Sequence, residues 1–530
     1  MSDTQPALMQ VSPHQPAARD WDFDVDVLVA GSGNGGMSAA LMAATGGADT
    51  LMVEISSQIG GNTLMGGGDL HVAGCKTWEE YNSFTEGLHD PVLGRVYVET
   101  FRNEYVPWLL SHGAYMHQPN PDAPYWHGDW KLGKGEPGQL GNKLYCDSLM
   151  KVYAGAGGKT LMQTRVVNLI ADDEGRVIGV RAKTWKKSPK EDGQTFVNIR
   201  ASKTIMATGG WLINGEMKQR YLGQDGHFSQ NHCGPFSSGE GLNICQAAGA
   251  ALSHRGWAGF AGALACVTAT TQMNADADAM LEMWRDLPPA EWKTPYMQGR
   301  LNPPPYSGIW VPDDGEVMRA ILVNNYGERY IDESNPINAK YSRLHQATIR
   351  QYRGFVWVIA DQRIHDETPG ADKALDEIIA EGGNWGTHGN VIIANSIQEF
   401  AEALSRAGVY KGAFLKTIEE YNLAIEEGRQ DLLPIPRSSS NGSGEWAIGK
   451  PPFYAIPVRV NPYFTMGGLR INGDAQVLDV QGAAIPNLYA PPPLGGGVQS
   501  EIYTGGVACA GTFGFRAARH AVSALRATRT

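Results

Sequence analysis

The stretch DVDVLVAGSGNGG, residues 24–36, decides the fold of this chain. Its first half alternates valine with other side chains, which predicts a strand, and residues 37–44 beyond the glycines are rich in good helix formers. Strand, glycine turn and helix together open a dinucleotide-binding unit. In this pattern Gly31 permits the tight turn, Gly33 lets the backbone approach a pyrophosphate, and Gly36 lets helix and strand pack closely.

A second apolar strand, residues 50–53, ends in Glu54. An acidic residue about 20 positions beyond the glycines is where such units hold a ribose hydroxyl. The N-terminus of the expected helix supplies N–H donors for the phosphates. These features predict nucleotide binding but do not separate FAD from NAD.

Further glycine-rich segments follow in order along the chain. Residues 59–68 read IGGNTLMGGG, 164–170 TRVVNLI, 175–180 GRVIGV, 203–210 KTIMATGG, 238–241 SGEG, 465–468 TMGG, 485–490 IPNLYA and 504–506 TGG. As an ordered set over residues 24–525 they resemble the fumarate reductase and 3-ketosteroid dehydrogenase superfamily of FAD enzymes. The resemblance implies FAD bound by Gly31, Gly33, Asn34, Gly35, Gly36, Glu54, Gly61, Asn62, Thr63, Gly67, Gly68, Val166, Ala207, Thr208, Gly209 and Gly506.

The same resemblance implies an α/β fold, with a discontinuous Rossmann-like FAD-binding domain and an inserted α+β cap domain. We expect a disordered tail at 1–20, the FAD domain at 21–315 and 465–530, and the cap at 316–464. Asn62 stands where membrane-bound relatives carry a flavin-linking histidine, which favours noncovalent FAD.

Composition excludes several other functions. With 44 Lys plus Arg against 55 Asp plus Glu, a net charge of −11, the chain lacks the positive charge that nucleic-acid binding requires. We see no signal peptide and no apolar run long enough for a membrane span, and therefore expect a cytoplasmic protein. The six cysteines form no C-x-x-C or haem motif, and we expect no metal. An external electron acceptor, namely oxygen, a quinone or a redox protein, is then required.

Three positions bear on the substrate. Soluble fumarate reductases place histidine before TMGG, arginine before the last glycine pair and arginine shortly after the cap glutamate. This chain has Phe464 and Tyr503 at the first two positions, and beyond Glu333 it reads SNPINAK, residues 334–340, without an arginine. Such a pocket would leave the two carboxylates of fumarate buried and unpaired, which costs several kcal/mol. Fumarate and succinate are therefore disfavoured. The resemblance of Tyr503 to the ketosteroid dehydrogenases implies instead a small, hydrophobic cyclic ketone, and we expect Phe464, Ile337 and Trp126 to line its pocket.

Tyr503 before TGG resembles the ketosteroid dehydrogenases, in which a tyrosine and a backbone N–H hold the ketone oxygen. The resemblance implies removal of an α-proton and transfer of a β-hydride to flavin N5, which creates a C=C bond. For the base, the family's tyrosine matches Ile337, so Tyr341, Lys340 and Tyr463 remain candidates. The aromatic loop 125–130 either lines substrate entry or packs a long loop onto the domain.

The sequence thus predicts an FAD-dependent desaturase of cyclic ketones. One alternative is an enoate or fumarate-type reductase that runs the reverse reaction. Another is a flavin-binding subunit without turnover, because the family's catalytic arginine is missing and Pro491–Pro493 depart from its usual loop.

Overall fold

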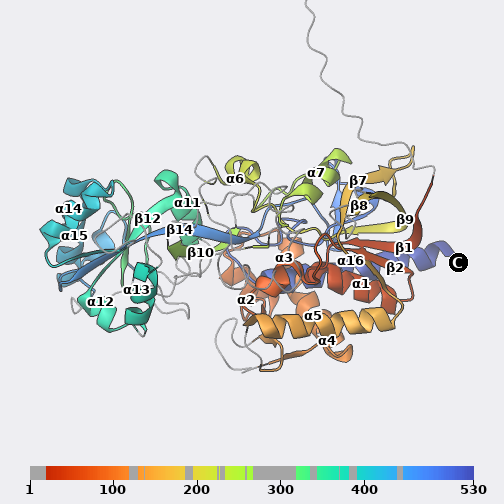
Figure 1. Ribbon diagram of the computed structural model, residues 1–530, viewed down its shortest axis with the longest axis horizontal. Helices are drawn as coiled ribbons and strands as arrows, with labels where there is room; N and C mark the ends of the chain where they lie inside the picture. The colour runs from red at the N-terminus through yellow and green to blue at the C-terminus, as the bar shows by residue number, and fades with distance from the viewer. Residues whose placement is uncertain are drawn as a thin grey trace, which may run out of the picture.

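The computed structural model describes residues 20–118, 129–135, 138–184, 195–223, 226, 229, 233–234, 236–256, 260–266, 318–334, 343–368, 370–380, 391–438 and 446–529. The tail expected at 1–20 lies outside these residues except for its last position. The chain forms two lobes (Figure 1). We call the lobe around the strand at residues 23–30 the FAD lobe and the lobe around the strand at residues 355–361 the cap lobe.

An eight-stranded sheet forms the centre of the FAD lobe. Its strand order is β15-β16-β9-β1-β2-β6, and β7 and β8 attach through β9. Strand β1 pairs in parallel with both β2 and β9. The strands are β1 Phe23–Ala30, β2 Thr50–Val53, β6 Lys159–Leu161, β7 Thr164–Ala171, β8 Val177–Thr184, β9 Thr195–Met206, β15 Gln476–Leu478 and β16 Ala484–Tyr489. Because β16 joins β9 in parallel, the C-terminal part of the chain completes this sheet, as the α/β prediction requires.

Helix α1, Asn34–Thr45, packs against α16, Gly506–Arg529, beside α5, Gly138–Gly155 (Figure 1). Glycines bring α1 and α16 into close contact, since a Cβ on Gly514 would overlap the carbonyl oxygen of Gly35. The N-terminal and C-terminal parts of the FAD lobe are therefore one packed unit.

The FAD lobe also contains shorter elements, three of which are strands that form a sheet of order β3-β5-β4. They are η1 Gly61–Met65, β3 Asp69–Leu70, α2 Trp78–Phe84, α3 Pro91–Thr100, the π-helical turn η2 Phe101–Tyr105, α4 Val106–Ser111, β4 Met116–His117, β5 Trp130–Leu132, α6 Gly215–Leu222 and α7 Glu240–Ala247.

The cap lobe is built on a five-stranded sheet of order β10-β14-β12-β11, with β13 paired to β14. Its strands are β10 Phe260–Cys266, β11 Ile321–Val323, β12 Phe355–Asp361, β13 Ile392–Ala394 and β14 Phe453–Thr465, and its helices are α11 Arg343–Ile349, η6 Tyr352–Gly354, α12 Gln362–Asp366, α13 Ala371–Ala380, α14 Ile397–Arg406, α15 Lys411–Glu426 and η7 Gln430–Leu432. Strand β10 belongs to this sheet although it precedes residue 316. The domain boundaries themselves stay a prediction.

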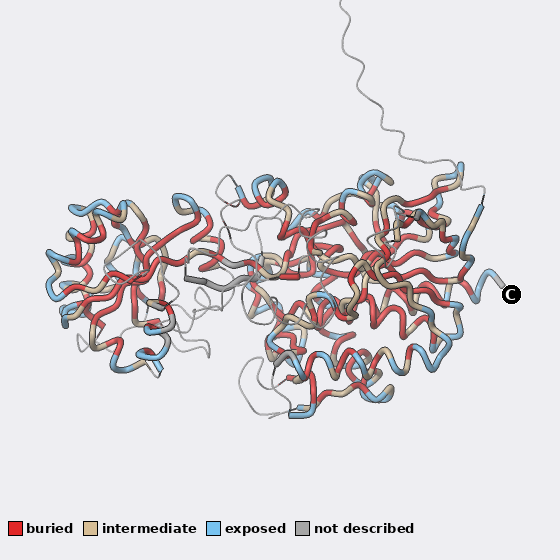
Figure 2. The backbone as a smooth tube through the Cα atoms, viewed as in Figure 1, coloured by how far each residue is buried: buried red, intermediate tan, exposed pale blue. Residues whose placement is uncertain are grey.

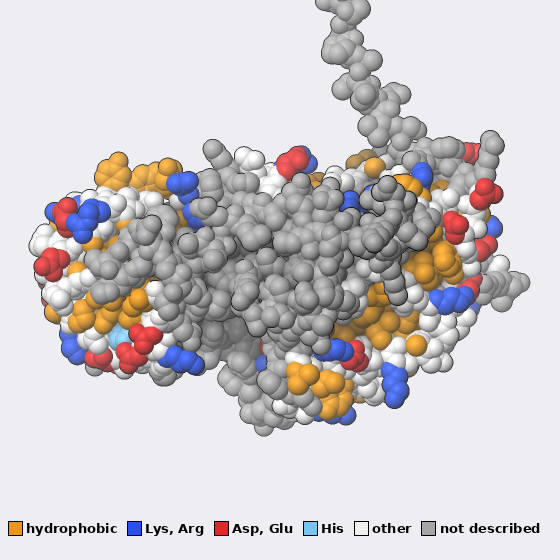
Figure 3. All heavy atoms as spheres, in the orientation of Figure 1, with side chains coloured by type: hydrophobic (Ala, Val, Ile, Leu, Met, Phe, Trp, Pro, Cys, Tyr) orange, Lys and Arg blue, Asp and Glu red, His pale blue; other side chains and the backbone are white. Residues whose placement is uncertain are grey.

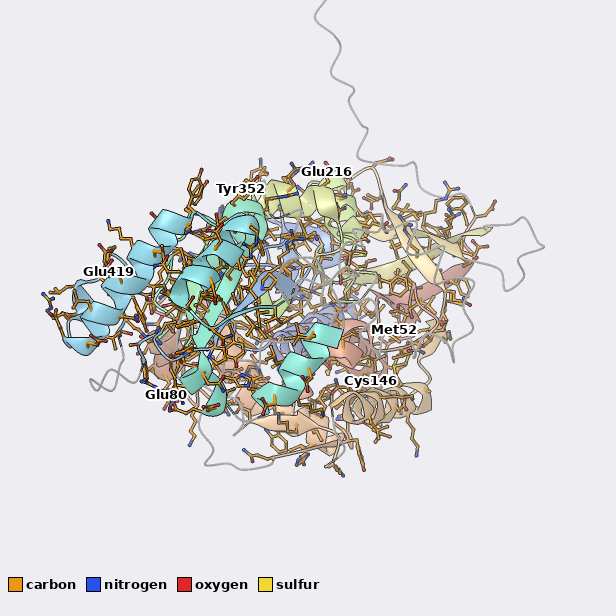
Figure 4. The ribbon with its side chains drawn as sticks, turned by 60° about the vertical axis from the view of Figure 1, so that its left-hand side comes forward. Met52, Glu80, Cys146, Glu216, Tyr352 and Glu419 are labelled. Carbon is orange, nitrogen blue, oxygen red and sulfur yellow. The ribbon has the colours of Figure 1, made fainter. Side chains whose placement is uncertain are left out.

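Both sheets are buried, with exposed residues concentrated on the outer helices and turns (Figure 2). Every residue of β12 is buried. In Figure 4, Met52 of β2 lies within the FAD lobe, whereas Glu419 projects from α15 at the far end of the cap. Five described cysteines are free thiols in buried positions: Cys75, Cys146, Cys233, Cys245 and Cys509.

The cap lobe encloses charged groups. Glu333 is fully buried, accepts a hydrogen bond from the Leu322 N–H at 2.8 Å and pairs with Arg329 at 2.5 Å. Arg437, also fully buried, lies 3.8 Å from the same carboxylate and donates to the Met318 carbonyl. The guanidinium of Arg437 stacks over Trp446, with its carbon 4.8 Å from the ring centroid.

Helix α11 fastens the cap lobe to the FAD lobe. Gln346 donates to the backbone carbonyl of Glu501 at 3.1 Å, and Arg343 pairs with Glu86 at 2.7 Å. This docking places the cap next to the loop that leads to Tyr503. On the face in Figure 3, acidic and basic side chains are interspersed at both ends of the molecule. Among the described helices, none combines the length and apolar character needed to cross a bilayer.

Candidate active site

The glycine turn has the geometry that the sequence predicted. Gly31 has a φ of 102°, a conformation that favours glycine, and a Cβ on Gly36 would overlap the Gly31 carbonyl oxygen. By contrast, a Cβ on Gly33 would have no atom within 4 Å. Gly33 is the N-cap of α1 and has no side chain to satisfy the first N–H groups of the helix. The turn therefore leaves open space beside the N-terminus of α1, as a pyrophosphate requires.

Glu54 closes the same turn from β2. Its carboxylate accepts from the Ser32 N–H and the Ser56 N–H, each at 2.8 Å. Burial raises the pKa of the Glu54 carboxyl, and the hydrogen bonds from Ser32 and Ser56 act against that rise. The Ser32 side chain and the Ile55 N–H are further hydrogen-bond donors to this carboxylate. The ribose contact of Glu54 stays a prediction.

The segment IGGNTLMGGG folds back onto the turn. Thr63 accepts a hydrogen bond from the Asn34 N–H at 2.9 Å, and a Cβ on Gly61 would lie 3.5 Å from Gly33. Asn62 accepts from the Gly234 N–H at 2.6 Å. Of the predicted cofactor residues, Gly61, Thr63 and Gly33 therefore meet in one place.

Asn34 has a role that the sequence did not predict. Its amide nitrogen donates to the hydroxyl of Tyr105 at 3.0 Å and to the Val507 carbonyl at 2.8 Å, and its amide oxygen accepts from Tyr145 at 2.9 Å. The side chain thus joins α1 to α16 and α5. Its assignment as an FAD ligand stays a prediction.

The end of β9 supplies the strongest test of whether FAD fits. The hydroxyl oxygens of Thr208 and Thr465 are buried without a hydrogen-bond partner, as is the amide oxygen of Asn142, whose nitrogen donates to the Gly66 carbonyl at 2.7 Å. A Cβ on Gly209 would meet nothing within 4 Å. Buried polar atoms without a protein partner are what a polar cofactor would satisfy. Four elements carry the remaining predicted ligands: Gly35 in α1, Gly67 and Gly68 before β3, Val166 in β7 and Ala207 after β9.

Tyr503 lies at the N-terminus of α16. Its phenol oxygen accepts a hydrogen bond from the Gly506 N–H at 2.6 Å. Burial raises the pKa of Tyr503, and the Gly506 N–H opposes that rise. The phenol therefore stays protonated, and its O–H remains as a donor. We expected the phenol and a backbone N–H to hold one ketone oxygen together, but here the Gly506 N–H donates to the phenol.

A buried network braces this turn. Gln499 accepts from the Thr504 N–H at 2.9 Å and donates to the Gly505 carbonyl at 3.2 Å. The Tyr97 hydroxyl lies 3.0 Å from the carbonyls of both Thr504 and Gly505. Both Tyr97 and Gln499 are almost wholly buried. Because they fix the backbone of Thr504 and Gly505, directly after Tyr503, they limit where the phenol O–H can point.

Three rings surround Tyr503. The ring centroids of Tyr463 and Phe464 each lie 5.7 Å away, and that of His71 lies 6.0 Å away, all in edge-on contact. Tyr463 and Phe464 were predicted, and a Cβ on Gly506 would overlap atoms near the Phe464 ring. His71 was missed, although a histidine three residues after a flavin-facing glycine run was a usable signal.

Other predicted site residues are not placed. Trp126, Ile337 and Tyr341 lie outside the described residues, as does Lys340. Their assignments to the substrate pocket and to catalysis stay predictions. In the described residues, no group of His, Cys, Asp and Glu is arranged to hold a metal ion.

Known proteins match this chain over most of its length. The FAD binding domain family matches residues 26–260 and 300–491. The NADH:fumarate oxidoreductase of Klebsiella pneumoniae is 26% identical over 508 residues, which cover 92% of this chain and 46% of that protein. A fumarate reductase (cytochrome) of Shewanella frigidimarina is 23% identical, and the match covers 91% of this chain and 74% of that protein. Among solved structures, the 3-ketosteroid-Δ4-(5α)-dehydrogenase of Rhodococcus jostii is similar, with a TM-score of 0.66 and 22% identity over 96% of this chain and 99% of that one.

The fold and cradle define a flavoprotein, an FAD-dependent oxidoreductase with an attached cap. The chain belongs to the FAD binding domain family. The expected cofactor, FAD, is thereby confirmed. The relatives and similar structures include fumarate reductases and a 3-ketosteroid dehydrogenase, in agreement with the expected superfamily. The chain spans less than half the length of its Klebsiella relative.

Proposed function

We propose that this FAD-dependent oxidoreductase of the CH–CH class introduces a C=C bond next to the carbonyl of a cyclic, largely apolar ketone. One observation carries the proposal: a protonated phenol, polarised by the Gly506 N–H, stands at the start of α16 within a box of aromatic rings. Of the three rings in contact with Tyr503, none belongs to a permanently charged residue.

The proposed chemistry follows from that donor. The O–H of Tyr503 donates to the ketone oxygen, which stabilises the enolate as the α-proton leaves. The hydrogen bond from Gly506 withdraws charge from the phenol oxygen, which makes its O–H a stronger donor. When bound, FAD supplies the two-electron acceptor for the β-hydride. An external electron acceptor completes the turnover.

Anaerobic titration of the yellow holoprotein with cyclic ketones tests this function. We expect 4-androstene-3,17-dione or a simpler cyclic ketone to bleach the flavin absorption near 450 nm, roughly one equivalent per flavin. Straight-chain dicarboxylates such as succinate serve as the comparison. Bleaching by succinate and by none of the ketones would remove the ketone proposal.

A second candidate is a reductase of the same fold that saturates an activated C=C bond. The two curated relatives carry such names, and the position of His71 favours it. The Nδ1 of His71 accepts from the Ala73 N–H at 3.1 Å, so a neutral ring carries its proton on Nε2 and is a donor beside Tyr503. Chemically reduced holoprotein that is reoxidised by an enone, but is never reduced by the matching ketone, would support this direction.

A further inference from the structure

A carboxylate lies on the segment that joins the glycines of residues 66–68 to His71, whose ring contacts Tyr503 at 6.0 Å and whose carbonyl packs against Gly505. Asp69 begins β3 directly after Gly67 and Gly68, and its Oδ2 lies 3.5 Å from the position of a Cβ on Gly67. Its side chain is 25% exposed, so a small ligand can reach it. The sequence reasoning did not single it out.

Asp69 is also coupled to the phenol. Burial raises the pKa of Tyr503, and the negative charge of Asp69 adds to the rise. The carboxylate therefore keeps the phenol protonated as a donor while remaining an acceptor itself. The two groups have opposite proton roles, one as an acceptor and one as a donor, a combination that suits proton transfer.

The strand pairing fixes the side chain of Asp69. Asp69 lies opposite Lys131 of β5, with which it forms an ion pair, and Lys131 lies opposite His117 of β4. Directly opposed residues in an antiparallel pair share a face of the sheet. Asp69, Lys131 and His117 thus form a polar row across β3, β5 and β4.

We propose that Asp69 is the base that removes the α-proton of the substrate opposite Tyr503; this assignment rests on the proposed function. The α-C–H bond breaks, its proton forms an O–H bond with the Asp69 carboxylate, and its electron pair moves into the enolate held by the Tyr503 O–H. The proton then leaves to water past the polar row. A carboxylate can take an α-proton when a phenol holds the enolate oxygen.

Proton exchange tests Asp69 separately from redox turnover. Holoenzyme in D2O is mixed anaerobically with excess cyclohexanone or 4-androstene-3,17-dione, and deuterium next to the carbonyl is followed by mass spectrometry. Asp69→Asn preserves the shape but cannot accept the proton, so we expect exchange to fall about 10²–10⁴-fold. Bound FAD and the spectral change on ketone binding should stay as in wild type.

The chain offers a matched control. Asp49 forms an exposed ion pair with Lys159 at 2.8 Å at the far side of the FAD lobe sheet, so Asp49→Asn makes the same chemical change away from the glycines. It should exchange at the wild-type rate. If Asp69→Asn fails to fold because Lys131 is left unpaired, the double variant Asp69→Asn with Lys131→Met removes both charges and should fold without exchange activity.

The outcomes separate the two proposals. Exchange by Asp69→Asn at the wild-type rate overturns the base assignment and leaves the proposed function standing if the flavin still bleaches. If the wild-type protein exchanges deuterium in an Asp69-dependent way but its flavin does not bleach, the base assignment is supported and desaturation is overturned. A wild-type protein that neither exchanges nor bleaches overturns both.

Discussion

The FAD cradle and the interior of the cap lobe are held together by different forces. In the cradle, Gly31 and Gly36 bring backbones into contact where any side chain would collide. In the cap, Glu333 and Arg437 are buried charges that depend on one another. The cradle should therefore fail when its shape changes, and the cap should fail when its charge changes.

The largest expected effect is at the cradle. Gly36→Ala places a Cβ on the Gly31 carbonyl oxygen, a backbone atom that cannot rotate away, so we expect a cost above about 4 kcal/mol and loss of FAD. Flavin absorbance of the purified protein and urea unfolding measure both. Gly155→Ala, at the end of α5 where a Cβ meets nothing within 4 Å, is the neutral control. Yellow, stable Gly36→Ala protein would refute the steric account.

The charge cluster of the cap gives the next effect. Glu333→Gln keeps the shape of the side chain but leaves Arg329 and Arg437 as buried cations without a counter-charge, which costs about 3–5 kcal/mol. Circular dichroism should show an early thermal transition while the flavin stays bound. Release of the flavin in the same early transition would mean that the FAD lobe unfolds together with the cap lobe.

The cap should also respond to acid. Burial lowers the pKa of His345 in α11 to about 4, against 6.5 for the free side chain. As pH falls, the unfolded chain therefore takes up a proton on His345 before the folded chain does. The free energy of unfolding decreases by about 3 kcal/mol from pH 6.5 to pH 4. His345→Leu should remove that part of the acid sensitivity, measured by urea midpoints at pH 7 and pH 5. The exposed His254 provides the control, His254→Gln, which should keep the wild-type slope.

The smallest effect sharpens the picture of the cradle. A Cβ at Gly33 touches no protein atom but enters the open space of the turn, so Gly33→Ala should fold normally. FAD binding should weaken about tenfold, which is ~1.4 kcal/mol. Titration of the apoprotein with FAD measures it, and an unchanged affinity would mean that the phosphates lie elsewhere.

The glycine turn could be predicted because its constraint is local. Gly31, Gly33 and Gly36 lie within one turn, and the conformation that each needs follows from its own neighbours. The order of the glycine segments then predicted the α/β fold and FAD. Tyr503, Tyr463 and Phe464 were found through the same alignment of segments, and the structure brings their rings together.

The support around the phenol could not be predicted in this way. Tyr97 and Thr504 are 407 residues apart in the chain, and Asn34 and Val507 are 473 apart. A buried tyrosine or asparagine has no sequence pattern that names its partner, since tertiary packing alone selects it. Asp69 and His71 were missed for a related reason, because their role depends on how β3 meets the start of α16.

The most direct test of the central claim is single-turnover flavin reduction by Tyr503→Phe, with a cyclic ketone that reduces the wild-type flavin. Removal of one donor to a developing oxyanion costs about 10²–10³ in rate. The account predicts that loss with FAD content unchanged, because the cradle does not use the phenol oxygen. Reduction at the wild-type rate by fully loaded Tyr503→Phe would contradict it.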